Sequence, residues 1–261
     1  MNSLPTAADV AALMEELAPL ELKMEWDNVG LQLGDGKKPV GKILVTLTVT
    51  DRIVEQAAAQ GVNLIVAHHP LIFRPLYQIR TDTYLGSLVA CLVRHEIAVY
   101  TCHTNLDTAA YGLNHWLAEE LGLEQTGVLV PGSVPGTGIG RVGLIRPRPV
   151  AALAEWVQEK LGSDVRIIGP RDRICERVAV CGGSGGDFVG HAVSSGAAAL
   201  ITGDVSYHDA LEAVGAGLAV IDAGHHGTEK VMVPHVASYL RERLPTAVQI
   251  LEDAGEDPFT S

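Results

Sequence analysis

Histidine and acidic side chains gather in a few short segments of this 261-residue chain. His68 and His69 are adjacent at the end of an apolar run, and a second pair, His225 and His226, is followed by Glu229. Imidazoles and carboxylates are the ligands that divalent transition metals accept. Successive side chains on a strand point to opposite faces, so adjacent histidines rarely meet at one point but can serve two neighbouring ions. The pattern predicts a metal site.

A third polar segment, from His103 to Asp107, follows another apolar run. Asp107 precedes a predicted helix and could equally be its N-cap, and a lone histidine such as His103 is more often a hydrogen-bonding group than a ligand. Asp204 and His208 could orient metal-bound imidazoles or simply cap a helix. Six of the ten histidines nevertheless lie in or just after predicted strand ends, which favours one shared site.

The segment Gly182–Gly186 lies between a predicted strand and a predicted helix. Backbone N–H groups there could bind an anion, and a tight strand-to-helix turn explains the glycines equally well. The segment matches neither the dinucleotide fingerprint nor the P-loop, because no Lys-Ser/Thr pair follows it.

The elements that must position these residues alternate between strands and helices. In the first half we expect strands at 42–49, 62–66 and 97–101, and helices at 11–17, 51–60, 83–95 and 108–121. In the second half we expect strands at 165–168, 177–181, 199–202, 218–221 and 247–251, and helices at 150–161, 187–195 and 206–214, with a last helix from about Pro234. This order predicts an α/β fold with parallel pairing.

A Gly/Pro-rich middle segment separates the two halves. We expect an N-terminal α/β half at 1–125, a hairpin or linker at 126–149, and a C-terminal α/β half at 150–261. Two halves with mostly parallel central sheets would then enclose a metal cleft beyond the carboxyl ends of their strands.

Composition narrows the functional classes. The formal net charge of −12 and the lack of a Lys/Arg cluster make nucleic acid an unfavourable partner. The four cysteines lack Cys-x-x-Cys spacing, which is typical of a reducing compartment. No apolar run reaches membrane-spanning length, and the N-terminus does not resemble a signal peptide. We therefore expect a cytoplasmic protein without a membrane partner.

Five segments in the same order resemble the signature of the NIF-three-like family, whose members are often labelled GTP cyclohydrolase I type II homologs. They are Trp26-Asp27-Asn28-Val29-Gly30-Leu31-Gln32-Leu33-Gly34, Ala67-His68-His69-Pro70, His103-Thr104-Asn105-Leu106-Asp107, Gly203-Asp204 with Tyr207-His208, and Gly224-His225-His226-Gly227-Thr228-Glu229. Some family members carry a long inserted domain between the halves, and this chain is similar to the short form without it.

The resemblance implies a centre of two divalent metal ions with ligands at His68, His69, Asp107, His225 and Glu229. We expect His69 and Asp107 on one ion, His68 and His225 on the other, and Glu229 on both. His103 and His226 are then candidates for proton transfer or for steadying the ligands. Imidazole and carboxylate ligands accept Zn, Fe, Mn, Co or Ni.

The family label implies hydrolysis that opens the purine ring of GTP with loss of formate, and the resemblance to the family implies a homo-oligomer in the form of a toroidal hexamer. Two further functions are compatible with the same ligands. A two-metal centre also suits hydrolysis of a phosphoester. Alternatively, the ions could stabilise a scaffold or regulatory oligomer without catalysis. The expected small-molecule substrate is a nucleotide or another phosphorylated compound.

Overall fold

The computed structural model describes residues 4–259, which form two compact α/β units. The first unit contains residues up to Leu106 together with Met232–Gly255, and the second contains Asp107–Val231 and the residues from Glu256. The chain therefore crosses between the units at positions other than the sequence-based limits of 125 and 150, and its last helix and strand return to the first unit. The prediction of two α/β halves is confirmed.

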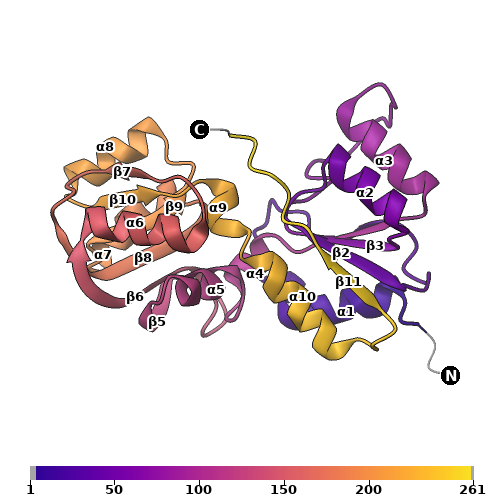
Figure 1. Ribbon diagram of the computed structural model, residues 1–261, viewed down its shortest axis with the longest axis horizontal. Helices are drawn as coiled ribbons and strands as arrows, with labels where there is room; N and C mark the ends of the chain where they lie inside the picture. Colours follow the sequence, from indigo (N-terminus) through magenta and orange to yellow (C-terminus); the bar gives the residue numbers. More distant parts are fainter. Residues whose placement is uncertain (1–3, 260–261) are drawn as a thin grey trace. The chain divides into compact units, whose positions relative to one another are not determined.

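The first unit is built on a five-stranded sheet with the order β1-β4-β3-β2-β11. Its central strands β2, β3 and β4 pair in parallel with each other and with β11, whereas β1 is antiparallel at the edge. Helices α2 and α3 cover one face, and α1 and α10 cover the other (Figure 1). The bounds are β1 Gly30–Leu33, β2 Lys42–Thr46, β3 Leu64–Ala67, β4 Ala98–Thr101, β11 Gln249–Glu252, α1 Ala7–Leu17, α2 Asp51–Gln60, α3 Tyr84–Arg94 and α10 Met232–Arg243, with a short 3₁₀ helix, η1, at Leu20–Leu22.

Local sequence explains the limits of these elements. The side chain of Thr50 accepts a hydrogen bond from the N–H of Ile53 and so caps α2, and Gly61 ends the helix in the left-handed conformation at φ 65°. Every residue of β3 is buried, as expected for a central parallel strand covered on both faces. The β3 strand ends at Ala67, so His68 and His69 follow directly at its carboxyl end.

The second unit has a six-stranded sheet with the order β5-β6-β8-β9-β10-β7. The central strands β8, β9 and β10 are parallel, and the pairs β5–β6, β6–β8 and β10–β7 are antiparallel. The Gly/Pro-rich middle of the chain is therefore a β-hairpin rather than a linker. The bounds are β5 Glu124–Pro131, β6 Gly138–Pro149, β7 Arg166–Ile168, β8 Ile174–Ser184, β9 Ala199–Gly203, β10 Ala219–Asp222, α5 Leu113–Glu120, α6 Val150–Leu161, α7 Val189–Ser194, α8 Tyr207–Gly215 and α9 His225–Glu229, with a 3₁₀ helix, η2, at Gly186–Phe188.

One predicted helix begins later than expected, and a separate short helix precedes it. Instead of a helix over 108–121, the chain forms α4 at Thr104–Thr108 and then α5. The carbonyls of Ala109 and Ala110, which would continue the helical ladder, accept hydrogen bonds of 2.9 and 2.8 Å from the guanidinium of Arg141 on β6. Arg141 is only 3% exposed, so this contact is part of the interior of the second unit.

Candidate metal centre

In the first unit, three imidazoles meet where β3 and β4 end. One ring nitrogen from each of His68, His69 and His103 lies within 4.8 Å of the other two. The ring centroids of His103 are 5.1 Å from His68 and 5.7 Å from His69. The two strands are parallel neighbours, so their carboxyl ends bring residues 35 positions apart to the same edge.

His68 has a defined tautomer. Its Nδ1 lies 2.8 Å from the carbonyl oxygen of Cys102, and a carbonyl only accepts hydrogen bonds, so Nδ1 carries the proton. The lone pair is then on Nε2, which is buried. Metal-binding histidines commonly have this arrangement, in which a protein oxygen holds the protonated ring nitrogen and the other nitrogen carries the lone pair.

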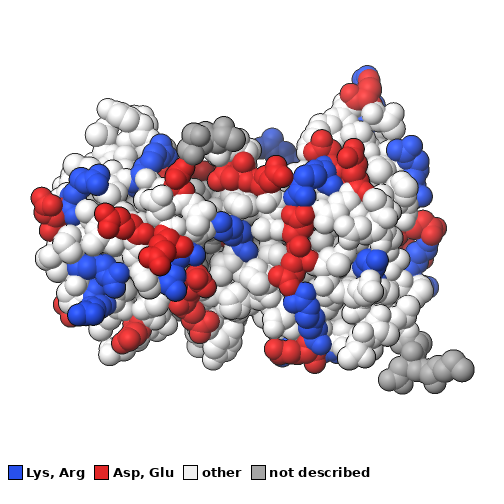
Figure 2. Space-filling view, in the orientation of Figure 1, with Lys and Arg blue, Asp and Glu red and all other residues white. Residues whose placement is uncertain are grey.

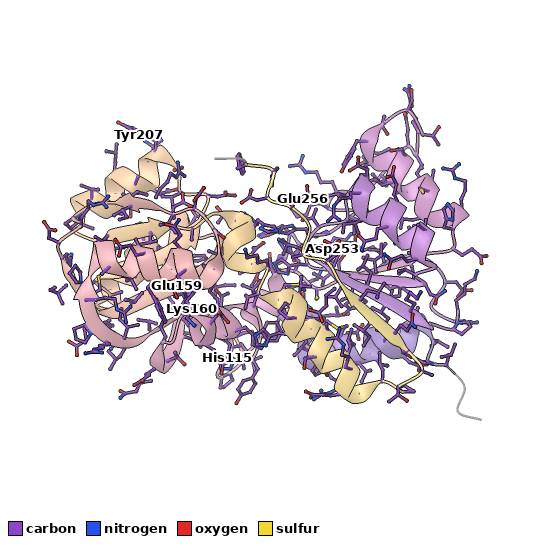
Figure 3. All side chains as sticks on the ribbon, in the orientation of Figure 1. His115, Glu159, Lys160, Tyr207, Asp253 and Glu256 are labelled. Atoms are coloured by element: carbon purple, nitrogen blue, oxygen red, sulfur yellow. The ribbon has the colours of Figure 1, made fainter. Side chains whose placement is uncertain are left out.

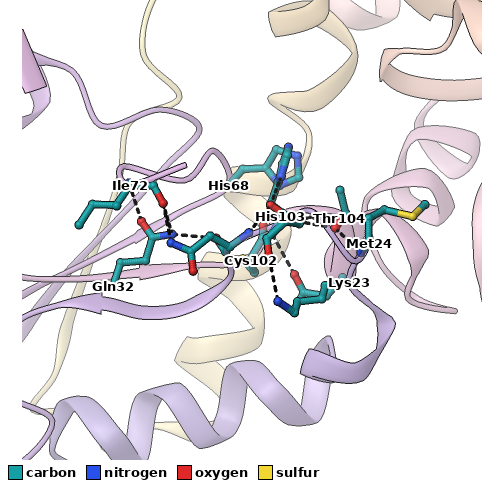
Figure 4. A network of polar contacts seen from close by, with 11 residues as sticks. Lys23, Met24, Gln32, His68, Ile72, Cys102, His103 and Thr104 are labelled. Atoms are coloured by element: carbon teal, nitrogen blue, oxygen red, sulfur yellow. Dashed lines mark hydrogen bonds and ion pairs between the residues drawn. The ribbon is translucent and has the colours of Figure 1, made fainter. Parts of the chain in front are cut away.

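His69 and His103 are held at the same ring atom. Nδ1 of His69 lies 2.7 Å from the hydroxyl of Thr48, and Nδ1 of His103 lies 3.0 Å from the carboxylate of Asp27. Figure 4 shows His68 and His103 within the network of polar contacts that includes the carbonyl of Cys102 and the side chain of Thr104. The Nε2 atoms of all three rings are therefore the ones that can bind a ligand.

Asp27 anchors this group, although the sequence did not assign it a role. The residue is 4% exposed, and its carboxylate also accepts hydrogen bonds from the backbone N–H, at 3.0 Å, and the hydroxyl of Thr104. Burial alone would raise the pKa of Asp27, but the hydrogen bonds from His103 and Thr104 outweigh burial and lower the pKa to about 2. Asp27 is thus a fixed negative charge behind the His103 ring.

In the second unit, His225 and Glu229 lie one helical turn apart on α9. Nε2 of His225 is 3.0 Å from a carboxylate oxygen of Glu229, and its Nδ1 is 2.8 Å from the carboxylate of Asp204. The hydrogen bond with Glu229 is the main cause that raises the pKa of His225 to about 9, and Asp204 adds to it against the opposing effect of burial. The site therefore has a negative potential that favours a cation.

The glycines of the segment 182–186, at the end of β8, leave room for the carboxylates of Glu229 and Asp209. Gly183 has φ 64°, and a Cβ atom there would overlap the carboxylate of Glu229 and come within 3.3 Å of the His225 ring. A Cβ at Gly186 would likewise overlap the carboxylate of Asp209. The N–H groups of Gly182 and Gly183 already donate to Asn114 and Thr228. The segment is therefore explained as a close approach of backbone to side chains, which disfavours an anion at this point.

Asp107 belongs to the same part of the second unit. The side chain of Asn114 donates to the carbonyl of Asp107 at 3.0 Å and accepts from the N–H of Gly182 at 2.9 Å. Burial raises the pKa of the Cys181 thiol, and the charges of Asp107 and Glu229 raise it further, so both carboxylates lie near this buried thiol. The structure thus brings three predicted ligands of the second unit, Asp107, Glu229 and His225, into one neighbourhood.

A cavity of about 530 Å³ adjoins α9 in the second unit. Its wall includes His225, His226, Lys230, Asp204 and Arg166. Among the described residues, Nε2 of His226 is buried without a hydrogen-bond partner. A volume of this size fits a small molecule.

Arg166 and His208 have other surroundings than the proposed metal ligands. Arg166 forms an ion pair with the buried Asp222, whose carboxylate also accepts a 3.1 Å hydrogen bond from the N–H of Gly224 and so fixes the turn before α9. His208 is exposed on α8 beside Tyr207, which points outward in Figure 3. Of the two residues considered for support of the ligands, Asp204 makes the contact and His208 does not.

Comparison with known proteins identifies the family. The model of the Duf34/NIF3 (NGG1p interacting factor 3) family matches residues 5–255. This chain belongs to the Duf34/NIF3 family. A protein of Clostridium perfringens named GTP cyclohydrolase 1 type 2 homolog is 36% identical over 255 residues, which cover 96% of this chain and 97% of that protein. A protein of the same name from Lactococcus lactis is 41% identical, covering 87% and 88% of the two chains.

The fold of the Duf34/NIF3 chain agrees with a solved relative. A crystal structure of a Bacillus cereus protein related to NIF3 has a TM-score of 0.94 and 28% identity, and the match covers 100% of both chains. No helix among residues 4–259 is long and apolar enough to cross a membrane. On the face seen in Figure 2, Lys and Arg alternate with Asp and Glu, so the described residues there offer no continuous basic surface to a polyanion.

Sequence reasoning missed the residues that hold the imidazoles and the Asp107 turn. Asp27, Thr48 and Asn114 contact residues that are 76, 21 and 68 positions away. Only Asp27 carried a signal, because it lies in the Trp26-Asp27-Asn28 segment of the family resemblance. Short polar side chains such as Thr48 and Asn114 are too common in loops to be singled out without the fold.

Proposed function

We propose that this Duf34/NIF3 chain binds two divalent metal ions through His68, His69, Asp107, His225 and Glu229 and hydrolyses a nucleotide. The observation that carries the proposal is shared by the ligand imidazoles: in His68, His69 and His225, Nδ1 is held by a protein oxygen within 2.8 Å. In His68 and His69 the other ring nitrogen, Nε2, is then the candidate ligand atom, and in His225 Nε2 lies 3.0 Å from the carboxylate of Glu229, the other proposed ligand on α9. Such fixed rings together with two carboxylates suit Zn, Fe, Mn, Co or Ni.

When bound, a pair of divalent ions lowers the pKa of water and polarises the bond to be broken. The residues of the chain supply the remaining functions. Glu229 and Asp107 contribute the negative charge that holds cations in a largely buried place. His103, whose Nδ1 contacts Asp27, can exchange a proton through Nε2, and His226 is the second candidate for this role from the wall of the cavity.

The name of the relatives suggests the reaction, which is opening of the purine ring of GTP with loss of formate. A phosphoester hydrolase is the second candidate, because Lys230 lines the cavity beside His225 and its ammonium could bind a phosphate. We further propose that the protein is a cytoplasmic toroidal homohexamer. The four cysteines are free, in agreement with a reducing compartment.

Metal content per chain tests the site. Elemental analysis of protein purified without a histidine tag should give about two ions per chain, and His225→Ala and Glu229→Gln should each reduce this number. His208→Ala is the matched control because His208 is exposed on α8, and its metal content should equal that of the wild type. Absence of metal after reconstitution with each of the divalent ions would refute the site.

Turnover tests the reaction. The metal-loaded wild type should release formate from GTP, or phosphate if the phosphoester reaction is the correct one, and Glu229→Gln should abolish the product. The His208→Ala control should retain the full rate. A metal-loaded protein that releases neither product from a panel of nucleotides and phosphate monoesters would contradict both enzymatic proposals.

A further inference from the structure

Trp26 is exposed, although tryptophan side chains usually bury a large area in the protein interior. Its side chain is 61% exposed, whereas Trp116 is 7% exposed and packs in the interior of the second unit. Phe73, which is 45% exposed, lies edge-to-face against Trp26 with ring centroids 5.8 Å apart. Leaving two aromatic rings in water forgoes the stabilisation of their burial, so the folding of this unit does not explain their position.

The backbone on both sides of Trp26 is fixed. The N–H of Met24 donates to the hydroxyl of Thr104 at 3.0 Å, and the N–H of Asp27 donates to the carbonyl of Met24 at 3.0 Å. The buried carboxylate of Asp27 is bound in turn to His103 and Thr104. The indole is therefore presented to solvent from a rigid turn, with little conformational entropy left to lose when a ligand binds.

Phe73 follows Ile72, whose backbone is bound to β1, the strand after the Trp26 turn. The backbone of Ile72 forms hydrogen bonds in both directions with the side-chain amide of Gln32 on β1, at 2.9 and 3.3 Å, and its carbonyl also accepts from Asn28 (Figure 4). Hydrogen bonds thus link the backbone next to Phe73 to the segment that follows Trp26. The two rings meet at an interplanar angle of 68° and form a corner.

The corner adjoins the imidazoles of the same unit. The Trp26 ring centroid is 6.2 Å from that of His103, and His103 contacts both His68 and His69. A planar ring stacked on either aromatic face would therefore have its edge near the groups proposed to bind metal and transfer protons. Aromatic faces of this kind bind heterocyclic bases with little dependence on the base.

We propose that Trp26 and Phe73 form the binding site for the planar heterocycle of the substrate, so that the substrate class is a free nucleoside or nucleotide and not a ring-free phosphoester. This inference rests on the proposed function. The formal charge of −12 opposes binding of a nucleic acid strand and favours a single small molecule as the source of the ring.

Binding of guanosine to the metal-loaded wild type tests the inference, with ribose 5-phosphate as the ring-free probe. Guanosine should quench the fluorescence of the exposed Trp26 in a saturable way, and ribose 5-phosphate should leave it unchanged. Phe73→Leu retains the reporter and should weaken guanosine binding by roughly 5- to 150-fold, the range for loss of one stacking partner. Trp26→Leu, measured by calorimetry, should weaken it by a similar factor.

Tyr77→Leu is the matched control. Tyr77 is 95% exposed in the loop after Phe73, and the variant should bind guanosine as the wild type does. Metal content is measured on the same preparations, so that failure of the metal site is seen separately from failure of the aromatic site. Quenching by guanosine that is lost in Phe73→Leu supports the aromatic site even in a protein without metal.

Two outcomes would overturn the inference. Guanosine affinity that stays at the wild-type value in both Trp26→Leu and Phe73→Leu, with metal content intact, would show that the rings do not bind the heterocycle. If instead these variants lower the oligomeric mass in light scattering while guanosine affinity is unchanged, the corner is a contact between copies of the chain.

Discussion

His68, His103 and His225 each place Nδ1 against an oxygen of the protein, and the three oxygens are a carbonyl and two carboxylates. A carbonyl fixes the tautomer, whereas a carboxylate also makes the ring more basic. His68 is therefore suited to a purely ligating role. His103 and His225 each face a carboxylate at Nδ1, and for His225 the hydrogen bond with Glu229, to which Asp204 adds, raises the pKa to about 9. One residue type thus has different hydrogen-bond partners at different positions of the site.

Asp27→Asn should reduce stability in a pH-dependent way. The folded-state pKa of about 2 is below the ordinary value of 3.8, so the carboxylate stabilises the fold fully above pH 3.8, and the contribution is lost as the pH falls towards 2. The variant should lose on the order of 2 kcal/mol of unfolding free energy at pH 7 and much less at pH 2. Urea denaturation at both pH values measures this difference.

The control for this experiment is Asp172→Asn, because Asp172 is exposed in the second unit. Its unfolding free energy should follow that of the wild type at both pH values. An Asp27→Asn variant that is destabilised equally at pH 7 and pH 2 would mean that Asp27 acts through packing or geometry, without a contribution from its charge.

At the scale of elements, the helices that begin and end with local signals were predicted most accurately. The helix 51–60 agrees with α2, which Thr50 caps and Gly61 ends, and the helix 150–161 agrees with α6, which ends at Gly162 in the left-handed conformation. The break between α4 and α5 depends on Arg141, some thirty positions away, and the antiparallel outer strands of the second sheet depend on pairing partners. Such non-local contacts leave no periodic trace in the sequence.

The candidate site follows the same division. The five proposed ligands were expected from the family resemblance, and their residue types and their places after strands are visible in the sequence. The residues that hold them were not, since a hydrogen bond such as that between His69 and Thr48 requires the sheet to be built first.

Gly183→Ala tests whether the end of β8 needs a glycine for the close approach of the Glu229 side chain. The added Cβ overlaps the Glu229 carboxylate, and alanine is strained at φ 64°. We expect a loss of about 1–3 kcal/mol in unfolding free energy and a marked loss of bound metal. Gly190→Ala is the control, because nothing lies within 4 Å of a Cβ there and α7 should tolerate alanine. Full metal occupancy in Gly183→Ala would contradict this account of the glycine.

Arg141→Met should destabilise the second unit strongly. The guanidinium donates to the carbonyls of Ala109, Ala110, Gly138 and Gly140, and burial lowers its pKa, so the contacts must offset the cost of a buried charge. Methionine leaves these carbonyls without their donor, at a cost of about 3–5 kcal/mol. Chemical denaturation measures the change, with the exposed Arg146→Met as control. A loss below about 1 kcal/mol would mean that water replaces the guanidinium.

At the scale of the whole molecule, the chain passes from one unit to the other three times. His68 and His69 belong to the first unit, and Asp107, His225 and Glu229 to the second. If the proposed ions are bound, metal binding contributes to stability as well as to chemistry. The scaffold function and the enzymatic function therefore share one ligand set, and removal of metal distinguishes them.

Removal of the ions by a chelator should lower the melting temperature of the protein, because a ligand that binds only the folded chain stabilises it by about 2.7 kcal/mol at a hundred times its dissociation constant. For an enzyme, Glu229→Gln should abolish turnover while light scattering still gives the oligomeric mass of the wild type. For a scaffold, the same variant and the chelator should both dissociate the oligomer, and the intact metal-loaded protein should show no turnover. The mass of Glu229→Gln beside that of His208→Ala thus decides whether the carboxylate serves assembly or chemistry.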